Sequence, residues 1–212
     1  AAYSNAVAVL QQAKNDIKKL EVVIADRELE IDQVVNSFQL KAEAHNLLFQ
    51  YRQAVEVYEK VAFILEEVKG KESLELARSY NNIAEAYRAL GKFDEALRYH
   101  LKDLGILELV LDTNHPNLAS SYNNIANTYR DLGQYQEALR YYLKTLTIYG
   151  FVLEANHPFL ATSFNNIANT YRDLGQYDKA LSFHQKALAI RELVLESNHL
   201  DLAQSYNNIA TT

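Results

Sequence analysis

Asparagine and arginine side chains recur along this chain in an arrangement that could recognise another polypeptide. Asn123, Asn127 and Arg130 are spaced at i, i+4 and i+7, so in a helix they would lie along one face. An amide both donates and accepts hydrogen bonds, so a row of asparagines can bind the backbone of an extended peptide whatever its sequence. A guanidinium group pairs with carboxylates, so the arginines favour a ligand with acidic groups. The residues predicted to bind a peptide are Asn81, Asn82, Arg88, Asn123, Asn124, Asn127, Arg130, Asn165, Asn166, Asn169, Arg172 and Asn207.

These residues belong to a repeat with a period of 42 residues. The segment Ser79-Tyr80-Asn81-Asn82-Ile83-Ala84 recurs at 121–126, at 163–168 with Phe164 in place of tyrosine, and at 205–210. Residues 35–73 fit the same pattern as a degenerate unit, in which Phe49 stands where the next unit has Gly91. We therefore divide the chain into an N-terminal stretch, 1–34, and a repeat array over 35–212. The units are 35–73, 74–115, 116–157, 158–199 and a truncated half repeat over 200–212.

Each full unit is predicted to form two antiparallel helices. In the third unit, the large apolar residues between Leu118 and Leu132 follow the three- and four-residue spacing of one helical face. Gly133 is expected to end that helix, and a second one follows from Tyr135. The next unit opens with Asn156-His157-Pro158, where asparagine can cap a helix and proline suits its first turn. Small Ala126 and Ala138 would let the two helices approach closely near the turn. The predicted fold class is all-α.

The combination of Asn-His-Pro, Asn-Asn-Ile-Ala, Leu-Gly-Gln-Tyr and Glu-Ala-Leu, in register over several units, resembles the tetratricopeptide repeat (TPR) of the kinesin light chain and nephrocystin-3 type. The resemblance is strong over 74–212 and weak over 32–73, and its period is longer than the usual TPR period of about 34 residues. It implies an α–α superhelix, or TPR solenoid, in which the first helices of the hairpins line a concave groove. It also implies a non-catalytic module that binds an extended peptide, and kinesin light chains favour acidic peptides.

Structural roles compete with peptide binding at the same positions. One asparagine of each pair could instead bond to the neighbouring repeat and only set the stacking, above all Asn82, Asn124, Asn166 and Asn208. Asp131 and Asp173 follow Arg130 and Arg172 directly and could already neutralise them. Asparagine is a mediocre helix former, worse than alanine by a few tenths of a kcal/mol. Eight asparagines in four pairs therefore lower the stability of these helices, and some use of the amide must offset this loss.

Catalytic, metal and cofactor sites are not predicted. His115, His157 and His199 recur in equivalent loops, but neighbouring helices pack about 8–10 Å apart, so the three cannot share one zinc ion and are assigned to helix starts. The chain has no cysteine, no glycine-rich phosphate loop and no HExxH motif. The net charge of −6 argues against nucleic acid. With no membrane span or signal peptide visible, no membrane partner and a cytoplasmic location are expected.

The two ends of the array leave alternatives open. Heptad-like spacing over residues 1–34 fits either a helix that caps the first repeat or a coiled-coil arm. The chain is expected to be a piece of a longer protein, cut within a repeat. Tyr206 and Ile209 would then present an apolar face, predicting end-to-end self-association or fraying. Besides peptide binding, the array could act as a structural spacer or self-assembly module, or as the regulatory arm of a larger enzyme.

Overall fold

The computed structural model describes residues 30–212, and every regular element in this part of the chain is a helix. Residues 30–47 form the first described helical segment. The predicted N-terminal helix over 1–34 falls almost wholly outside the described residues and stays a prediction. None of the described helices is both long enough and apolar enough to cross a membrane. The later helices are α2 (Tyr51–Lys69), α3 (Leu74–Ala89), α4 (Phe93–Val110), α5 (Pro116–Asp131), α6 (Tyr135–Val152), α7 (Pro158–Asp173), α8 (Tyr177–Val194) and α9 (Leu200–Ala210).

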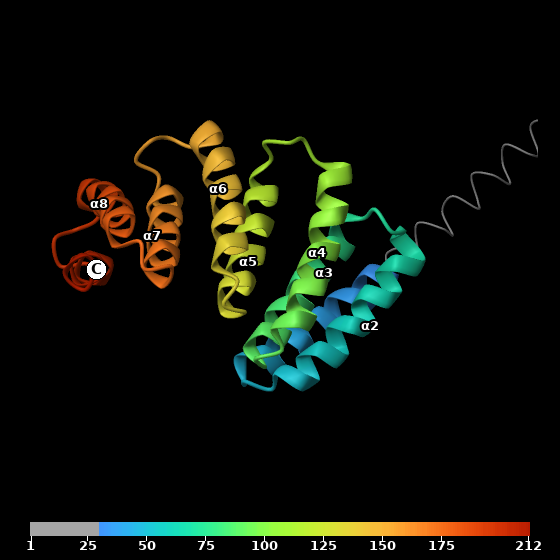
Figure 1. The fold of residues 1–212 in the computed structure, drawn as a ribbon. Coiled ribbons are helices and arrows are strands. Elements are labelled where there is room, and N and C mark those ends of the chain that lie inside the picture. The colour runs from blue at the N-terminus through green and yellow to red at the C-terminus, as the bar shows by residue number, and fades with distance from the viewer. Residues whose placement is uncertain (1–29) are drawn as a thin grey trace, which may run out of the picture.

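The helices form a row of antiparallel hairpins. Helices α3 and α4 pair with each other, as do α5 with α6 and α7 with α8, and each hairpin packs on the next through α4 with α5, α6 with α7 and α8 with α9. Figure 1 shows the row running from α2 on the right to the C-terminus on the left. Because each helix packs mainly on its neighbours in sequence, the molecule is a helical superhelix of the solenoid type, and the predicted all-α fold class is confirmed.

Histidine side chains begin three of the first helices. The Nδ1 atoms of His115, His157 and His199 accept hydrogen bonds from the backbone N–H two residues later, at 3.1, 3.2 and 3.1 Å. Each therefore satisfies one of the amides that a helix start leaves free. The assignment of these histidines to helix starts is confirmed. The suggestion that Asn156 caps the helix was wrong, because the cap residue is His157, which follows it.

Turns between the two helices of a hairpin use the left-handed backbone conformation. Gly91, Gly133 and Gly175 have φ of 71°, 72° and 70°, where a Cβ atom would be strained. The degenerate first unit makes the same turn with Phe49 at φ 58°, the one described non-glycine residue with positive φ. The predicted end of the helix before Gly133 is confirmed, since α5 ends at Asp131 and Leu132 is its C-cap.

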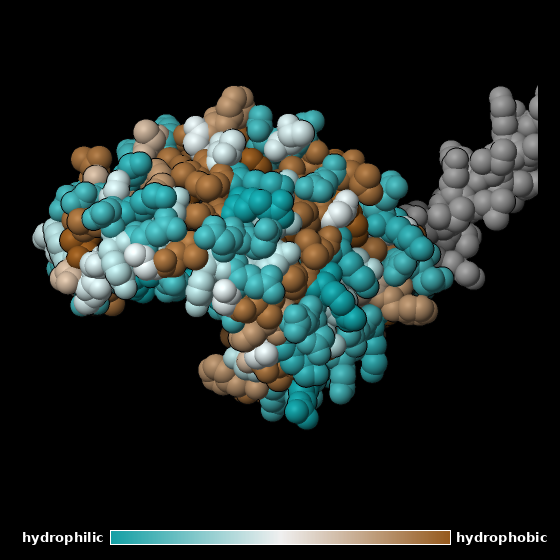
Figure 2. All heavy atoms as spheres, in the orientation of Figure 1, coloured by the Kyte–Doolittle hydropathy of each residue, from teal (hydrophilic) through white to brown (hydrophobic). Residues whose placement is uncertain are grey.

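The core repeats with the sequence. Ile83, Ile125 and Ile167 occupy equivalent places in α3, α5 and α7, and each is 0% exposed. Ala126 and Ala138 are also fully buried, which agrees with their predicted place at the close contact near the turn. On the face shown in Figure 2, polar side chains lie interleaved with apolar ones across the whole row of hairpins.

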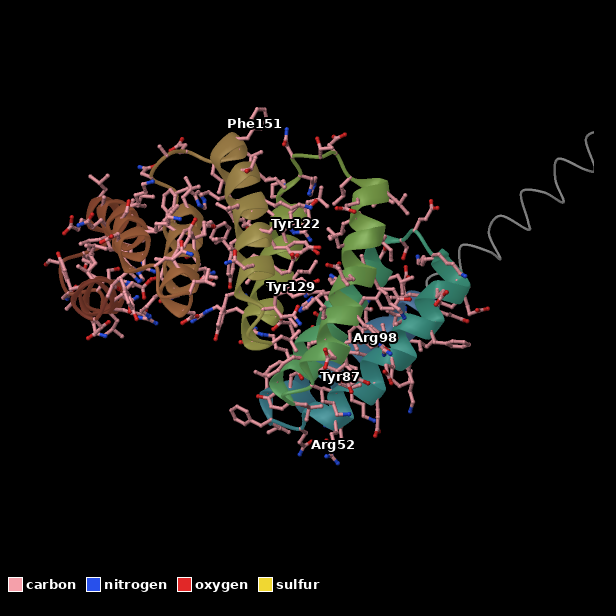
Figure 3. The ribbon with its side chains drawn as sticks, viewed as in Figure 1. Arg52, Tyr87, Arg98, Tyr122, Tyr129 and Phe151 are labelled. Atoms are coloured by element: carbon pink, nitrogen blue, oxygen red, sulfur yellow. The ribbon has the colours of Figure 1, made fainter. Side chains whose placement is uncertain are left out.

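An aromatic layer joins the two helices of each hairpin. The ring of Tyr129 stacks on that of Tyr141 with centroids 5.5 Å apart, and Lys144 Nζ lies 4.7 Å from the centroid of the Tyr122 ring. Figure 3 shows Tyr122 and Tyr129 on the side of their hairpin that faces α4. The Tyr122 hydroxyl donates to Glu108 Oε1 of α4 at 2.8 Å. Aromatic stacking and cation–π contacts therefore hold the two helices of a hairpin together, and the tyrosine hydroxyl bonds to the preceding hairpin.

The last helix ends the row with one face uncovered. Tyr206 of α9 is 52% exposed, while its hydroxyl donates to Glu192 of α8 at 2.7 Å, and Ile209 is only half-buried. The helix is formed as far as Ala210. End-to-end self-association through this face stays a prediction.

Candidate functional site

Asparagine side chains join the first helices of successive hairpins. Asn124 Nδ2 donates to Asn81 Oδ1 at 2.9 Å, and the same bond recurs between Asn166 and Asn123 at 3.2 Å. A third bond runs from Asn208 Nδ2 to Asn165 Oδ1 at 2.9 Å. These bonds link α3, α5, α7 and α9, which lie two elements apart in the chain. The first helices therefore lie side by side along one side of the row.

Each asparagine pair has a fixed division of roles. In the three later pairs the second asparagine donates to the first asparagine of the preceding unit. This geometry leaves the amide nitrogens of Asn81 and Asn165 without a hydrogen-bond acceptor among residues 30–212. Asn123 Nδ2 makes only a long 3.5 Å contact with its neighbour Asn124. Asn82 and Asn207 form no side-chain hydrogen bond within the described residues, and the position of the preceding unit that matches Asn81 is Gln39.

Arginines on the same helices pair across the repeat boundary. Arg88 Nε lies 2.5 Å from Asp131 Oδ2, and Arg130 Nε lies 2.7 Å from Asp173 Oδ2. The sequence had suggested that Asp131 neutralises the adjacent Arg130, but Asp131 pairs with the arginine of the preceding unit. Arg172 forms no ion pair within the described part of the chain. The four side chains are 22–33% exposed, so the contribution of each ion pair to stability is small.

The third polar position of each first helix turns toward its own second helix. Asn127 Oδ1 accepts a hydrogen bond from the Tyr142 hydroxyl at 2.5 Å, and Glu85 Oε1 lies 3.4 Å from His100 Nε2. Burial would raise the pKa of Glu85, but His100 and Arg88 outweigh it and lower that pKa. In the next unit His184 stands in the place of Tyr142, and desolvation by burial, aided by Arg172 and Arg191, lowers its pKa to about 4. Asn127 is therefore already engaged by the fold, whereas Asn169 has no hydrogen-bond partner among the described residues.

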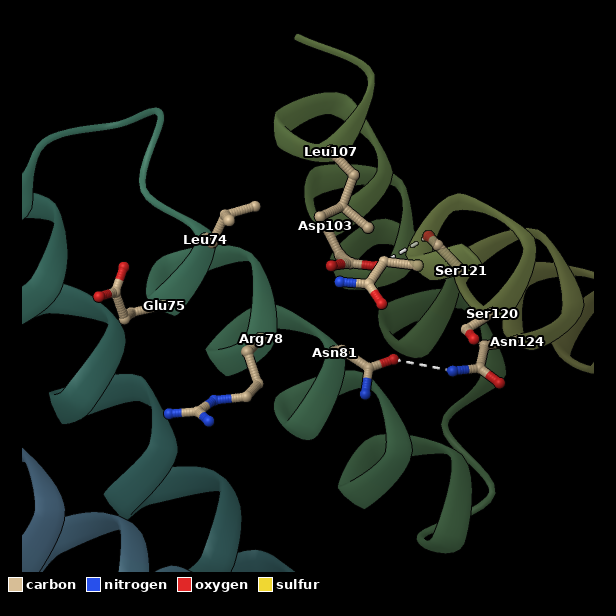
Figure 4. A pocket seen from close by; sticks show the side chains of 10 residues that line it. Leu74, Glu75, Arg78, Asn81, Asp103, Leu107, Ser120, Ser121 and Asn124 are labelled. Carbon is tan, nitrogen blue, oxygen red and sulfur yellow. Dashed lines mark hydrogen bonds between the residues drawn. The ribbon is translucent and has the colours of Figure 1, made fainter. Parts of the chain in front are cut away.

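A pocket of about 550 Å³ opens between α3 and α5 and reaches down to α4. Its walls include Leu74 and Asn81 of α3, Asp103 and Leu107 of α4, and Ser121 and Asn124 of α5. Figure 4 shows Asp103 beside Ser121, with the Asn81–Asn124 bond below them and Arg78 extending away from Asp103. The pocket lies on the side of the row where the asparagines join the first helices, because two of its walls come from these helices.

Sequence reasoning missed this pocket and its acidic residue. Asp103 is only 4% exposed, and its Oδ2 accepts a hydrogen bond from Ser121 Oγ at 2.7 Å. Burial raises the pKa of the Asp103 carboxyl to about 6, and the bond from Ser121 and the nearby His100 offset this only in part. A signal was available: Asp103 stands on the inward face of its helix, where the next two units carry Thr145 and Ala187.

The chain matches a family model described as Tetratricopeptide repeat at residues 34–108, 75–150, 117–192 and 159–212. These overlapping matches together cover residues 34–212 and follow the units that the 42-residue period defines. None of the curated proteins matches the chain.

Solved structures share the same architecture. A protein of Podosopora anserina, described as a kinesin light chain with nearly identical TPR-like repeats, is 26% identical, with a TM-score of 0.74 over 84% of each chain. A single-residue variant of that protein gives a TM-score of 0.75 at the same identity and coverage. BtubC (BKLC) of P. vanneervenii is 24% identical, with a TM-score of 0.72 over 80% of this chain and 68% of that one, a likeness of fold.

Proposed function

Because the chain belongs to the tetratricopeptide repeat family, with repeats of the kinesin light chain kind that generally serve protein–protein interaction, we propose that it binds an extended segment of a partner protein in its concave groove. The observation that carries this proposal is the row of unpaired amide groups along the joined first helices. Asn81 and Asn165 are fixed by the bonds that their Oδ1 atoms accept, yet their Nδ2 groups have no acceptor within residues 30–212. Such preorganised donors suit the carbonyl groups of a peptide backbone.

Charge at the groove refines which peptides would fit. Arg88 and Arg130 are already paired with Asp131 and Asp173, so an acidic ligand residue would have to compete with these carboxylates. Arg172 has no such competitor among the described residues. An acidic preference, if the ligand shows one, is therefore expected at the α7 end of the groove. We place this role in a non-catalytic, cytoplasmic scaffold.

The proposal is tested by removing the free amide donors while keeping the stacking bonds. Peptides are first selected from a random library on the whole chain, and their affinity is measured by fluorescence anisotropy. In the triple variant Asn81→Asp, Asn123→Asp, Asn165→Asp, each carboxylate can still accept the bond from Asn124, Asn166 or Asn208. We expect the variant to stay folded and to bind the selected peptides about tenfold more weakly or worse, since each lost donor leaves a buried peptide carbonyl unpaired.

A matched control makes the same chemical change on the outer helices. Gln53, Gln136 and Gln185 are exposed side chains of α2, α6 and α8, so Gln53→Glu, Gln136→Glu, Gln185→Glu adds the same charge through the same amide-to-carboxylate exchange. This control is expected to bind like the parent chain. Unchanged affinity in the asparagine variant, or equal loss in the control, would rule out the groove as the site.

A further inference from the structure

Asp103 is a buried carboxylate without a cationic partner. It is 4% exposed, and Ser121 supplies its only described hydrogen bond, to Oδ2. No described lysine, arginine or histidine forms an ion pair with it. A buried charge normally has both a charged partner and several hydrogen bonds, because leaving it unpaired destabilises the fold. Asp103 also lies on the wall of the pocket between α3 and α5, so a group that enters this pocket can reach it.

The equivalent space at the next repeat boundary is filled by the chain itself. Tyr149 stands in the place of Leu107, and its ring lies 5.7 Å from that of Phe159, which replaces Asn117. The Tyr149 hydroxyl lies 3.3 Å from Ser120 Oγ. At this boundary Thr145 replaces Asp103, so the aromatic pair covers a neutral position.

At the boundary after that, the same space holds a guanidinium group. Arg191 takes the place of Leu107, and its Nη1 donates to Ser205 Oγ at 2.6 Å and to the Asp201 carbonyl at 3.4 Å. Ser205 is the repeat equivalent of Ser121, and Ala187 takes the place of Asp103. The fold can thus seat an arginine side chain against this serine. At the boundary where the chain supplies Arg191, Ala187 stands in place of the carboxylate. At the boundary that carries Asp103, Leu107 stands in place of the arginine and the space is open.

We propose that the pocket between α3 and α5 binds an arginine or lysine side chain of the peptide ligand, whose charged end pairs with Asp103 and Ser121. Leu74 and Leu107 form the apolar part of the wall, which suits the aliphatic stem of such a side chain. The other charged groups on the pocket wall are Glu75 and Arg78 of α3, and His100 faces Asp103 from its own helix. Arg78 extends away from Asp103, so it does not fill the site (Figure 4). This inference builds on the proposed groove function and names the position where one ligand side chain is recognised.

The experiment uses small probes, so that its outcome does not depend on the selected peptides. N-acetyl-arginine methylamide, the lysine analogue and the neutral isostere N-acetyl-citrulline methylamide are titrated into the whole chain, and backbone amide NMR shifts are followed. We expect the arginine probe to shift Ser121 and Asn124 and to bind about tenfold more tightly than citrulline at about pH 7.5, because only the cation pairs with the ionised carboxylate. As Asp103 becomes protonated below its pKa of about 6, the preference should disappear.

Two variants and one control complete the test. Asp103→Asn keeps the size of the side chain and should abolish the preference for arginine over citrulline. Leu107→Arg should fill the pocket from within, as Arg191 does at its own boundary, and block the probe. Asp112 is an exposed acidic residue in the α4–α5 loop. The control Asp112→Asn should change neither the binding of the arginine probe nor its preference over citrulline. Equal binding of citrulline and arginine, or an unchanged preference in Asp103→Asn, would overturn the inference. Selected peptides that still depend on the asparagine donors would in that case leave the groove proposal standing.

Discussion

Replacing Ile125 by alanine is expected to lower the free energy of unfolding by about 2–4 kcal/mol, the usual cost of removing most of a fully buried isoleucine side chain. Ile125 is 0% exposed in α5, which packs against both α4 and α6. A cavity formed there weakens both the hairpin and its boundary with the preceding unit. Urea unfolding of the whole chain measures the change, and a loss of stability smaller than about 1 kcal/mol would contradict this account of the core.

The chain contains its own matched control for this substitution. Ile209 occupies the equivalent position in α9, where it is only half-buried because no hairpin follows within the described residues. Ile209→Ala should therefore cost much less than Ile125→Ala, although the chemical change is identical. Equal costs at the two positions would show that neighbouring hairpins do not create the core burial, contrary to the solenoid description.

Replacing Asp103 by asparagine is expected to stabilise the protein at neutral pH, which is unusual for a buried residue. Burial raises the pKa of Asp103 from 3.8 to about 6 in the folded chain, so the folded state holds this proton more tightly than the unfolded state. The resulting stability is complete below pH 4 and is lost as the pH rises through about 6. Asparagine does not ionise, so the advantage of the variant should grow by about 2 kcal/mol between pH 4 and 7.

The measurement for Asp103 is urea unfolding of the parent chain and the variant at several pH values. Only the difference between the two proteins is used, because the other carboxylates titrate in both. Asp112→Asn, which removes one exposed carboxylate by the same exchange, is the matched control. A parent chain that becomes more stable relative to Asp103→Asn as the pH rises would mean that Asp103 has a cationic partner within the fold.

The repeat architecture could be predicted because each step of the argument is local. Helical spacing, the turn glycine and the first-turn proline depend on residues a few positions apart, and the 42-residue period shows that one hairpin recurs. The cap was assigned to the wrong residue because Asn156 and His157 are neighbours and both can accept a hydrogen bond. Only the backbone angles decide which of them faces the free amides.

The partners of the groove residues could not be predicted from spacing within one helix. Arg88 pairs with Asp131, and Asn124 with Asn81, across 43 residues. These pairings depend on the rotation and translation of each hairpin relative to the preceding one. Tyr142 engages Asn127 for a similar reason, since the approach of the two helices of a hairpin sets that contact. Asp103 differs, because comparison of equivalent positions would have exposed it as a carboxylate where the other units have threonine and alanine. Whether its pocket is open depends on Leu107 being smaller than Tyr149 or Arg191.

Site-specific cross-linking would test most directly whether a ligand lies in the concave groove. The chain has no cysteine, so a single cysteine can be placed at Ser120 or Thr162 on the first helices, or at Thr147 on the outer helix α6; all three side chains are exposed. A selected peptide that carries a thiol-reactive group is added to each variant, and the cross-linked fraction is measured by mass spectrometry. The account predicts cross-linking at Ser120→Cys and Thr162→Cys and little at Thr147→Cys. Cross-linking mainly at Thr147→Cys would contradict it.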